Sequence, residues 1–471
     1  MLFSSIVFLF YFLPVFFALY AALRCRNAVL LAGSLLFYAW GEARSLWLLL
    51  LVGGIAWLGG RAIHASQQHG RGHRIVLAGT IAAQLLLLGS FKYARFLIAQ
   101  LPFPPPPSWR PLAQLELPLG ISFFTFHAIS YVMDIHRRTV SRPATPLQLA
   151  VYLSMFPQLV AGPIVRYSTI AGEIAHRRIT LADMGGGIRL FIIGLAQKVL
   201  LANTLAGPVD AIFALPAPDA RTAWFGAVCY MLQIYLDFGG YSLMAIGLAR
   251  MMGLTLPANF RHPYVSSSIT EFWRRWHISL STWFRDYLYI PLGGNRRGRL
   301  RTYANLWVVF LLCGLWHGAA WNFVLWGAWH GSFLVLERAG LGGALQLLWR
   351  PLRHGYALLV VLLGWVLFRA TDLSHAATMM RALIGYGAAA SPGFGEYAFF
   401  GEYAPASVLT ALAVGAAASV PWDGLRRRLP DTGPAAALAS TAAMAALATL
   451  LIVSAASLAT GTYNPFIYFR F

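Results

Sequence analysis

The chain has 471 residues, of which 58% are hydrophobic and only 11% are charged, and its mean hydropathy is +0.63. This composition is typical of a polytopic membrane protein and excludes an ordinary soluble enzyme. The net charge of +20 would suit nucleic-acid binding in a soluble protein. Here the arginines cluster in short loops between apolar segments, so the positive-inside rule and anionic lipid explain the charge more simply.

Apolar segments recur along the whole chain, and a segment of about twenty residues is long enough to cross the hydrocarbon core. We predict an all-α bundle of about eleven transmembrane helices with re-entrant and interfacial pieces around a central passage, forming one domain over residues 1–471. N-terminal spans occupy 1–100, a catalytic core 115–370 and C-terminal spans 371–471. The predicted apolar segments are 2–23, 27–40, 46–63, 75–98, 119–135, 149–165, 187–215, 224–248, 303–315, a segment starting at 319, 355–368, 407–420 and 435–458.

The N-terminal segment lacks a basic start and a small-residue cleavage site, so it is interpreted as a first span and not as a removed signal peptide. Arg24 and Arg26 follow it, and Arg61, Arg71 and Arg74 lie between the third and fourth segments. Because cytoplasmic loops carry the excess of arginine, we expect both loops in the cytoplasm and the N-terminus outside.

Three segments carry polar or helix-breaking residues at membrane depth. The run from Phe156 to Pro163 holds two prolines and a glycine, and broken backbone survives in a bilayer only where protein or a water-filled cavity shields it. We interpret it as a re-entrant or kinked element lining a cavity; the alternative is a proline kink that only packs. Asp237 is expected to accept structural hydrogen bonds, from tyrosine, serine or broken backbone. Lys198 is expected to reach the interface along its aliphatic stem.

The stretch 266–331 is the most unusual part of the chain. Ser268 and Glu271 form a capping-box pattern that predicts a helix start. Phe272, Trp276, Leu280, Trp283 and Tyr287 then recur at steps of three and four, which gives one apolar stripe, with Arg274, Arg275 and Arg285 falling away from it. Such a helix is expected to lie half sunk at a membrane interface. It ends near Pro291, before a basic cluster from Arg296 to Arg301.

An apolar segment then runs into Trp316-His317-Gly318. Ionisable side chains inside membrane segments are costly, so His317 is a functional hypothesis by default. The alternative is a structural histidine that is hydrogen-bonded between helices.

Three blocks of this region resemble the conserved blocks of the membrane-bound O-acyltransferase superfamily. They are Phe272-Trp273-Arg274-Arg275-Trp276-His277-Ile278-Ser279-Leu280-Ser281, the run from Phe284 to Arg296, and Leu315-Trp316-His317-Gly318. The resemblance is to the bacterial branch, first to alginate O-acetyltransferase membrane subunits and then to teichoic-acid D-alanyl transferase membrane subunits. It extends over most of the chain and is weakest between Ser374 and Pro430. It implies that the Phe156–Pro163 block belongs to the core, near the path of the acyl donor.

Acyl transfer from a thioester to an alcohol needs a base, donors for the oxyanion and shelter from bulk water. The resemblance implies that His317 is the base and that His277 matters too, either in positioning the thioester or in stabilising the oxyanion. Asn322 is a candidate oxyanion donor, with a packing amide as the alternative. His330 and His127 are expected to be structural, and the remaining histidines lie near arginines in loops. The residues expected to contact substrate are Trp273, Trp276, Arg274, Arg285, Trp316 and Asn322.

The implied reaction moves an acyl group, most simply acetyl, from a cytoplasmic thioester such as acetyl-CoA towards an exported polysaccharide such as alginate. The implied location is the bacterial inner membrane. No tightly bound cofactor is expected, and no metal, since no His/Glu/Asp set has zinc-ligand spacing. Expected partners are a periplasmic acetyl-transferring protein, a polysaccharide export and synthesis complex, and membrane lipids. The alternatives are a D-alanyl transferase served by an acyl carrier protein, and a transporter or channel without chemistry.

Overall fold

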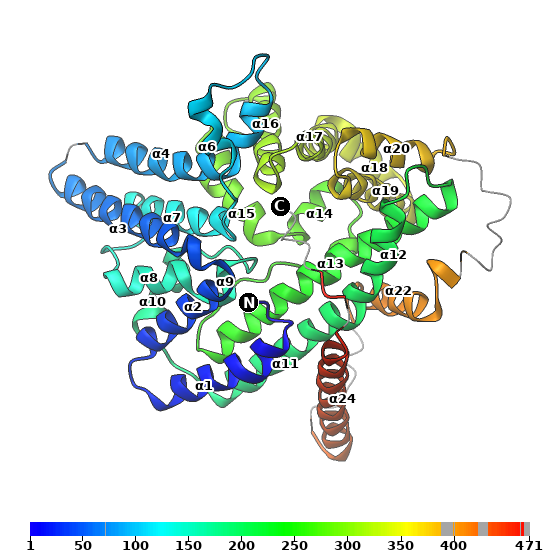
Figure 1. Cartoon of the computed structure of the whole chain (residues 1–471), viewed down its shortest axis with the longest axis horizontal. Coiled ribbons are helices and arrows are strands. Elements are labelled where there is room, and N and C mark those ends of the chain that lie inside the picture. Colours follow the sequence, from blue (N-terminus) through cyan, green and yellow to red (C-terminus); the bar gives the residue numbers. More distant parts are fainter. Residues whose placement is uncertain (71, 388–398, 400, 423–431, 462, 466–471) are drawn as a thin grey trace. The chain divides into compact units, whose positions relative to one another are not determined.

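The computed structural model describes residues 1–70, 72–387, 399, 401–422, 432–461 and 463–465 (Figure 1). Within these ranges every regular element is a helix. The chain divides into two compact units. The first comprises Met1–Phe191 and Met244–Pro257, and the second comprises Ile192–Leu243 and Ala258–Phe471. Arg71 and the terminal run 466–471, which entered the predictions, lie outside the described residues.

The first unit is built from short and medium-length helices in which α3 packs against both α4 and α7, and α2 packs against α8. A phenylalanine cluster fills its core, with Phe156 in edge contact with the rings of Phe8, Phe12 and Phe16. Its elements are η1 (Phe8–Phe12), α1 (Leu13–Ala22), α2 (Arg26–Glu42), α3 (Leu46–Gln68), α4 (His73–Lys92), α5 (Ala94–Ala99), α6 (Arg110–Ala113), α7 (Ile121–His136), α8 (Pro146–Ser154), α9 (Phe156–Leu159), α10 (Tyr167–Ala175) and the start of α11 (Leu181–Ala196).

The proline-containing segment is broken, as predicted: α8 ends at Ser154 and the one-turn α9 begins at Phe156. Side chains satisfy the backbone groups that the break releases. Ser34 accepts from the Phe156 amide at 3.1 Å, and His127 Nε2 accepts from the Val165 amide at 3.3 Å. His127 is fully buried, so it is a hydrogen-bonded core histidine, as expected, and the break is held by protein contacts.

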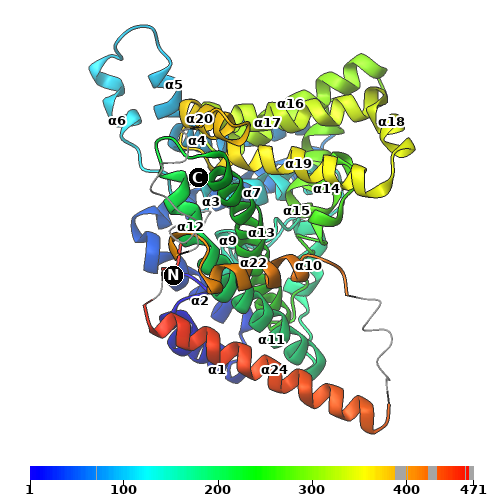
Figure 2. The same ribbon diagram turned by 90° about the vertical axis from the view of Figure 1, so that its right-hand side faces the viewer.

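The second unit contains most of α13 (Ala220–Met251) and all of α24 (Pro434–Ala459), the two longest helices among the described residues. Figure 2 shows α16, α17 and α19 side by side, and their packing is extensive. Its elements are η4 (Gln197–Ala202), α12 (Asn203–Phe213), most of α13 (Ala220–Met251), α14 (Ile269–Arg275), α15 (Ile278–Phe284), η6 (Arg285–Tyr289), α16 (Arg299–His317), α17 (Trp321–Leu336), η7 (Glu337–Leu341), α18 (Gly342–Leu347), α19 (Arg350–Arg369), α20 (Leu373–Leu383), α22 (Ala406–Ala418) and α24 (Pro434–Ala459).

Among the described residues, five helical runs are long and apolar enough to span a membrane. They are Arg26–Gln68, His73–Lys92, Leu181–Phe213, Arg350–Arg369 and Pro434–Ala459. The all-helical membrane character is therefore confirmed, whereas the count of about eleven spans is not. Several predicted spans are divided or short: the first becomes the 15-residue apolar run Phe8–Ala22, and that in 407–420 becomes the 13-residue α22.

One prediction about a buried charge is wrong. Lys198 does not extend to an interface: its side chain is 1% exposed, and Nζ lies 2.8 Å from Asp237 Oδ1 and 2.7 Å from Asn203 Oδ1. Close helix packing explains this, because a Cβ on Gly240 would lie 2.6 Å from the Gly194 carbonyl oxygen. Because the two helices are so close, Lys198 and Asp237 face each other. Lys198 is therefore a partner of Asp237, for which we expected donors from tyrosine, serine or broken backbone.

Candidate active site

The aromatic stretch after Ser268 forms two short helices and not the single helix that its stripe predicts. α14 ends at Arg275, α15 begins at Ile278, and His277 between them has left-handed backbone angles, φ 41° and ψ 53°. The preceding loop stabilises this bend: Ile278 donates to the Asn259 carbonyl at 2.9 Å, and Arg261 donates to the Arg275 carbonyl at 3.0 Å. Left-handed backbone in a non-glycine residue is strained and is often found at functional sites.

The start of α14 is held more firmly than the capping pattern predicts. Ser268 Oγ accepts from the Glu271 amide at 3.0 Å, which confirms the predicted helix start. In addition, the Glu337 carboxylate accepts from the amides of Ile269 at 2.6 Å and Thr270 at 2.9 Å. A carboxylate suits a helix N-terminus because it satisfies free amides and faces the positive end of the dipole. Glu337 was missed from the sequence, where it is simply an acidic residue at the end of an apolar segment.

The α16–α17 hairpin fixes His317 at the last residue of α16. Glycines allow these helices to touch: a Cβ on Gly314 would collide with the Phe323 carbonyl oxygen, and one on Gly327 with the Phe310 carbonyl oxygen. Small residues at a helix crossing permit this close backbone approach in membranes. Gly314 is one turn before His317, so the crossing sets the position of the imidazole.

The structure brings the two predicted histidines together. The ring centroids of His277 and His317 are 6.5 Å apart, and both residues are buried, with exposed fractions of 1% and 6%. The indole of Trp316, another predicted site residue, lies 6.1 Å from the His277 ring. Residues 40 positions apart in sequence therefore meet in one buried cluster of the second unit, shielded from bulk solvent.

Asn259 orients His277. Its Oδ1 lies 3.0 Å from His277 Nδ1 and also accepts from Ser279 Oγ at 2.9 Å, while its Nδ2 donates to Ser242 Oγ at 3.1 Å. Because an amide oxygen only accepts, Nδ1 of His277 carries the proton, and Nε2 is the basic nitrogen of the neutral ring. Sequence reasoning missed Asn259; the available signal was a lone amide between apolar residues shortly before the Phe272–Ser281 block.

Aromatic rings surround His317 on several sides. Trp326 and Phe368 meet it edge to face, with centroids 5.0 Å and 5.1 Å away. Trp273 and Trp276, which were expected to contact substrate, are buried in the same aromatic cluster: Trp273 donates weakly to His330 Nδ1 at 3.4 Å, and Trp276 packs 4.7 Å from Trp365. The Trp273 contact agrees with the structural role expected for His330.

The other predicted substrate residues are Arg274, Arg285 and Asn322. Arg274 is exposed, and Arg285 is bound to Asp286 at 2.6 Å, which raises the pKa of the Arg285 guanidinium above its ordinary value. Asn322 donates to the carbonyl oxygen of Ala370 at 2.8 Å, at the end of α19. That contact is the packing alternative; the oxyanion role of Asn322 remains a prediction. In the described part of the chain, no group of three His, Cys, Asp or Glu could hold a metal ion.

A family model described as the membrane-bound O-acyltransferase family matches residues 95–342, a range that contains both paired histidines. The chain belongs to this family and is a membrane-bound O-acyltransferase, a multi-pass membrane enzyme. This outcome displaces the transporter or channel alternative.

The similarity to individual relatives extends beyond residues 95–342. A probable alginate O-acetylase of Pseudomonas aeruginosa is 43% identical over 82% of this chain and 75% of the relative. A peptidoglycan O-acetyltransferase of Helicobacter pylori is 35% identical over 82% of this chain and 80% of the relative. A teichoic acid D-alanyltransferase of Bacillus subtilis is more distant, at 28% over 53% of this chain and 65% of the relative.

Proposed function

We propose that the protein transfers an acetyl group from a cytoplasmic thioester towards a polysaccharide that is being exported across the bacterial inner membrane, so that this polysaccharide becomes O-acetylated. The names of the relatives with the higher identities support acetyl as the acyl group and a polysaccharide such as alginate as the acceptor. The peptidoglycan relative marks a second acceptor of the same chemical class. Acetyl-CoA is the simplest donor.

The observation that carries this proposal is the buried pair of His277 and His317, with ring centroids 6.5 Å apart. In the reaction, an acceptor hydroxyl attacks the thioester carbonyl, a carbon–oxygen bond forms and the carbon–sulfur bond breaks. His317 takes the hydroxyl proton and returns it to the leaving thiolate. Burial keeps water from competing as the nucleophile.

His277 has two candidate roles. In the first it holds the acyl group and stabilises the oxyanion beside His317. The Asn259 contact favours a second role, because a ring that donates through Nδ1 presents Nε2 as a base. In either role, Asn259 positions the imidazole and does not itself contact substrate.

The expected partners follow from the reaction. An acceptor outside the membrane calls for a periplasmic protein that receives the acetyl group, together with the export and synthesis complex of the polysaccharide. D-alanyl transfer from a carrier protein is the second candidate function; the lower identity and coverage of the D-alanyltransferase relative support it less.

The test uses inner-membrane vesicles containing the full chain, supplied with acetyl-CoA labelled in the acetyl group. We expect label in a polysaccharide ester and release of free CoA thiol. The matched control is the His317→Ala variant at equal expression. Transfer of D-alanine from a charged carrier protein, without acetyl transfer, would establish the second candidate instead.

A further inference from the structure

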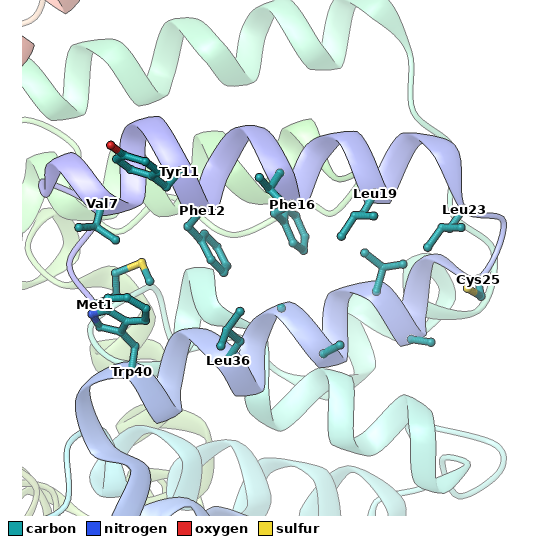
Figure 3. Close-up of a pocket in the computed structure, with 15 residues that line it drawn as sticks. Met1, Val7, Tyr11, Phe12, Phe16, Leu19, Leu23, Cys25, Leu36 and Trp40 are labelled. Carbon is teal, nitrogen blue, oxygen red and sulfur yellow. The ribbon is translucent and has the colours of Figure 1, made fainter.

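A long apolar groove runs between the first two helices, η1–α1 and α2, within the first unit (Figure 3). Two rows of side chains at four-residue spacing form its walls: Tyr11, Val15, Leu19 and Leu23 on one helix, and Ala28, Ala32, Leu36 and Trp40 on the other. Phe12 and Phe16 form its floor. The groove has a volume of about 920 Å³.

Alanines and a glycine make the groove on the α2 side. Ala28, Ala32 and Gly33 leave space that larger side chains would fill, whereas Leu36 and Trp40 close the far end. Residues 28 to 40 of α2 span about 18 Å, at about 1.5 Å per residue. One leaflet of a bilayer core is roughly 15 Å thick, so the groove is long enough to hold an acyl chain across one leaflet.

A basic pocket of about 450 Å³ joins the other end of the groove, and Leu23, Cys25 and Ala28 line both. Arg24, Arg26 and Arg177 contribute three positive charges, and none of the described residues that line this pocket is acidic. Hydrogen bonds fix Arg177: its guanidinium donates to Tyr20 Oη and to Asn27 Oδ1, each at 2.6 Å. The pocket therefore contains one guanidinium that hydrogen bonds hold in place, together with the exposed Arg24 and the half-buried Arg26.

We propose that this groove and pocket form a binding site for one anionic glycerophospholipid. The phosphate is bound by Arg24, Arg26 and Arg177, and an acyl chain lies between α1 and α2. Any lipid would cover an apolar face in a bilayer; the arginine pocket at the groove end selects an anionic headgroup. The groove in turn distinguishes a lipid from a free phosphate compound, which has nothing to place between the helices.

The test measures lipid binding to the full chain purified in detergent, by native mass spectrometry. The probes are phosphatidylglycerol, phosphatidylcholine and glycerol 3-phosphate. We expect one phosphatidylglycerol molecule to bind with clear preference over phosphatidylcholine, and no binding of glycerol 3-phosphate. Arg24→Gln/Arg26→Gln is expected to weaken phosphatidylglycerol binding by about 10- to 30-fold, because each arginine contributes about 1 kcal/mol to the attraction of an anionic lipid. Arg177 is left in place because it also supports Tyr20 and Asn27.

Controls separate the site from general charge and folding effects. Arg299→Gln/Arg301→Gln removes the same charge from the exposed first turn of α16 and is expected to leave binding unchanged. Ala32→Trp fills the groove and is expected to weaken binding of both lipids, whereas Ala82→Trp on an exposed position of α4 is not. Thermal melting confirms that each variant is folded. The proposal would be overturned if the two lipids bound equally, or if Arg24→Gln/Arg26→Gln or Ala32→Trp left binding unaffected. Tight binding of glycerol 3-phosphate would also contradict it, because the site would then bind anions without a lipid chain.

Discussion

Asn259 accepts a hydrogen bond from Nδ1 of His277 at 3.0 Å, and its own amide is fixed by Ser242. This contact sets both the direction and the tautomer of an imidazole that lies beside His317. It also joins the loop before the aromatic block to the residue at its bend.

Asn259→Ala is expected to lower turnover by about 10²-fold, the typical cost of misplacing a catalytic group by about 1 Å, with little change in KM for the thioester. Steady-state kinetics in vesicles check this. Asn259→Asp keeps the acceptor, so it should restore part of the rate and move the acidic limb of the pH–rate profile to higher pH, because a carboxylate stabilises the protonated ring. If the pH–rate profile of Asn259→Asp is identical to that of the wild type, Asn259 has only a packing role.

His317→Ala is expected to reduce acetyl transfer by about 10²–10⁴-fold, the usual contribution of a general base, while expression and membrane insertion stay normal. Labelled-acetyl transfer measures the loss. His69→Ala, at the exposed end of α3, is the matched histidine control. Near wild-type turnover in purified His317→Ala protein would remove His317 from the mechanism.

His277→Ala is expected to impair transfer, less completely if His277 holds the donor than if it takes the proton. Donor affinity and turnover, measured separately, distinguish these roles. Because His277 has a positive φ, His277→Gly is the better-matched variant: it removes the imidazole while keeping the backbone unstrained. Unchanged affinity and turnover in the glycine variant would return His277 to a structural role.

Gly314→Ala is expected to destabilise the protein by about 1–3 kcal/mol, a typical cost of overpacking, and to lower activity, because the added methyl collides with the Phe323 carbonyl oxygen. Thermal unfolding and turnover are the measurements. Gly79→Ala in α4, where an added Cβ meets nothing within 4 Å, is the control and should be neutral or slightly stabilising. Equal behaviour of the two variants would mean that the α16–α17 crossing tolerates separation.

A cysteine placed at Arg297 is expected to react with an impermeant thiol reagent only from the cytoplasm, since the arginine bias places the basic loops there. A cysteine at position 317 should be largely protected. Labelling of position 297 from outside would overturn the predicted orientation and the direction of acyl transfer.

Sequence patterns predicted the helices far better than the contacts between them. Apolar length located most helices, and the Phe156–Pro163 run predicted a real break, because composition and proline act locally. The bend at His277 was not predictable from the stripe, since hydrogen bonds from the Asn259 loop override local helix periodicity. Asn259 and Glu337 were missed for the same reason: each acts on a partner 18 or more residues away.

The Lys198–Asp237 ion pair has a consequence for how the chain is made. A lone lysine or aspartate at the centre of a membrane helix costs about 2.5–3.5 kcal/mol during insertion. The run Leu181–Phe213 carries the lysine and α13 carries the aspartate, with only residues 214–219 between the two helices. We therefore expect the run Leu181–Phe213 to be inserted stably only after the residues up to Asp237 have been synthesised. A nascent chain released before Asp237 would leave the lysine uncompensated and would be a target for membrane quality control.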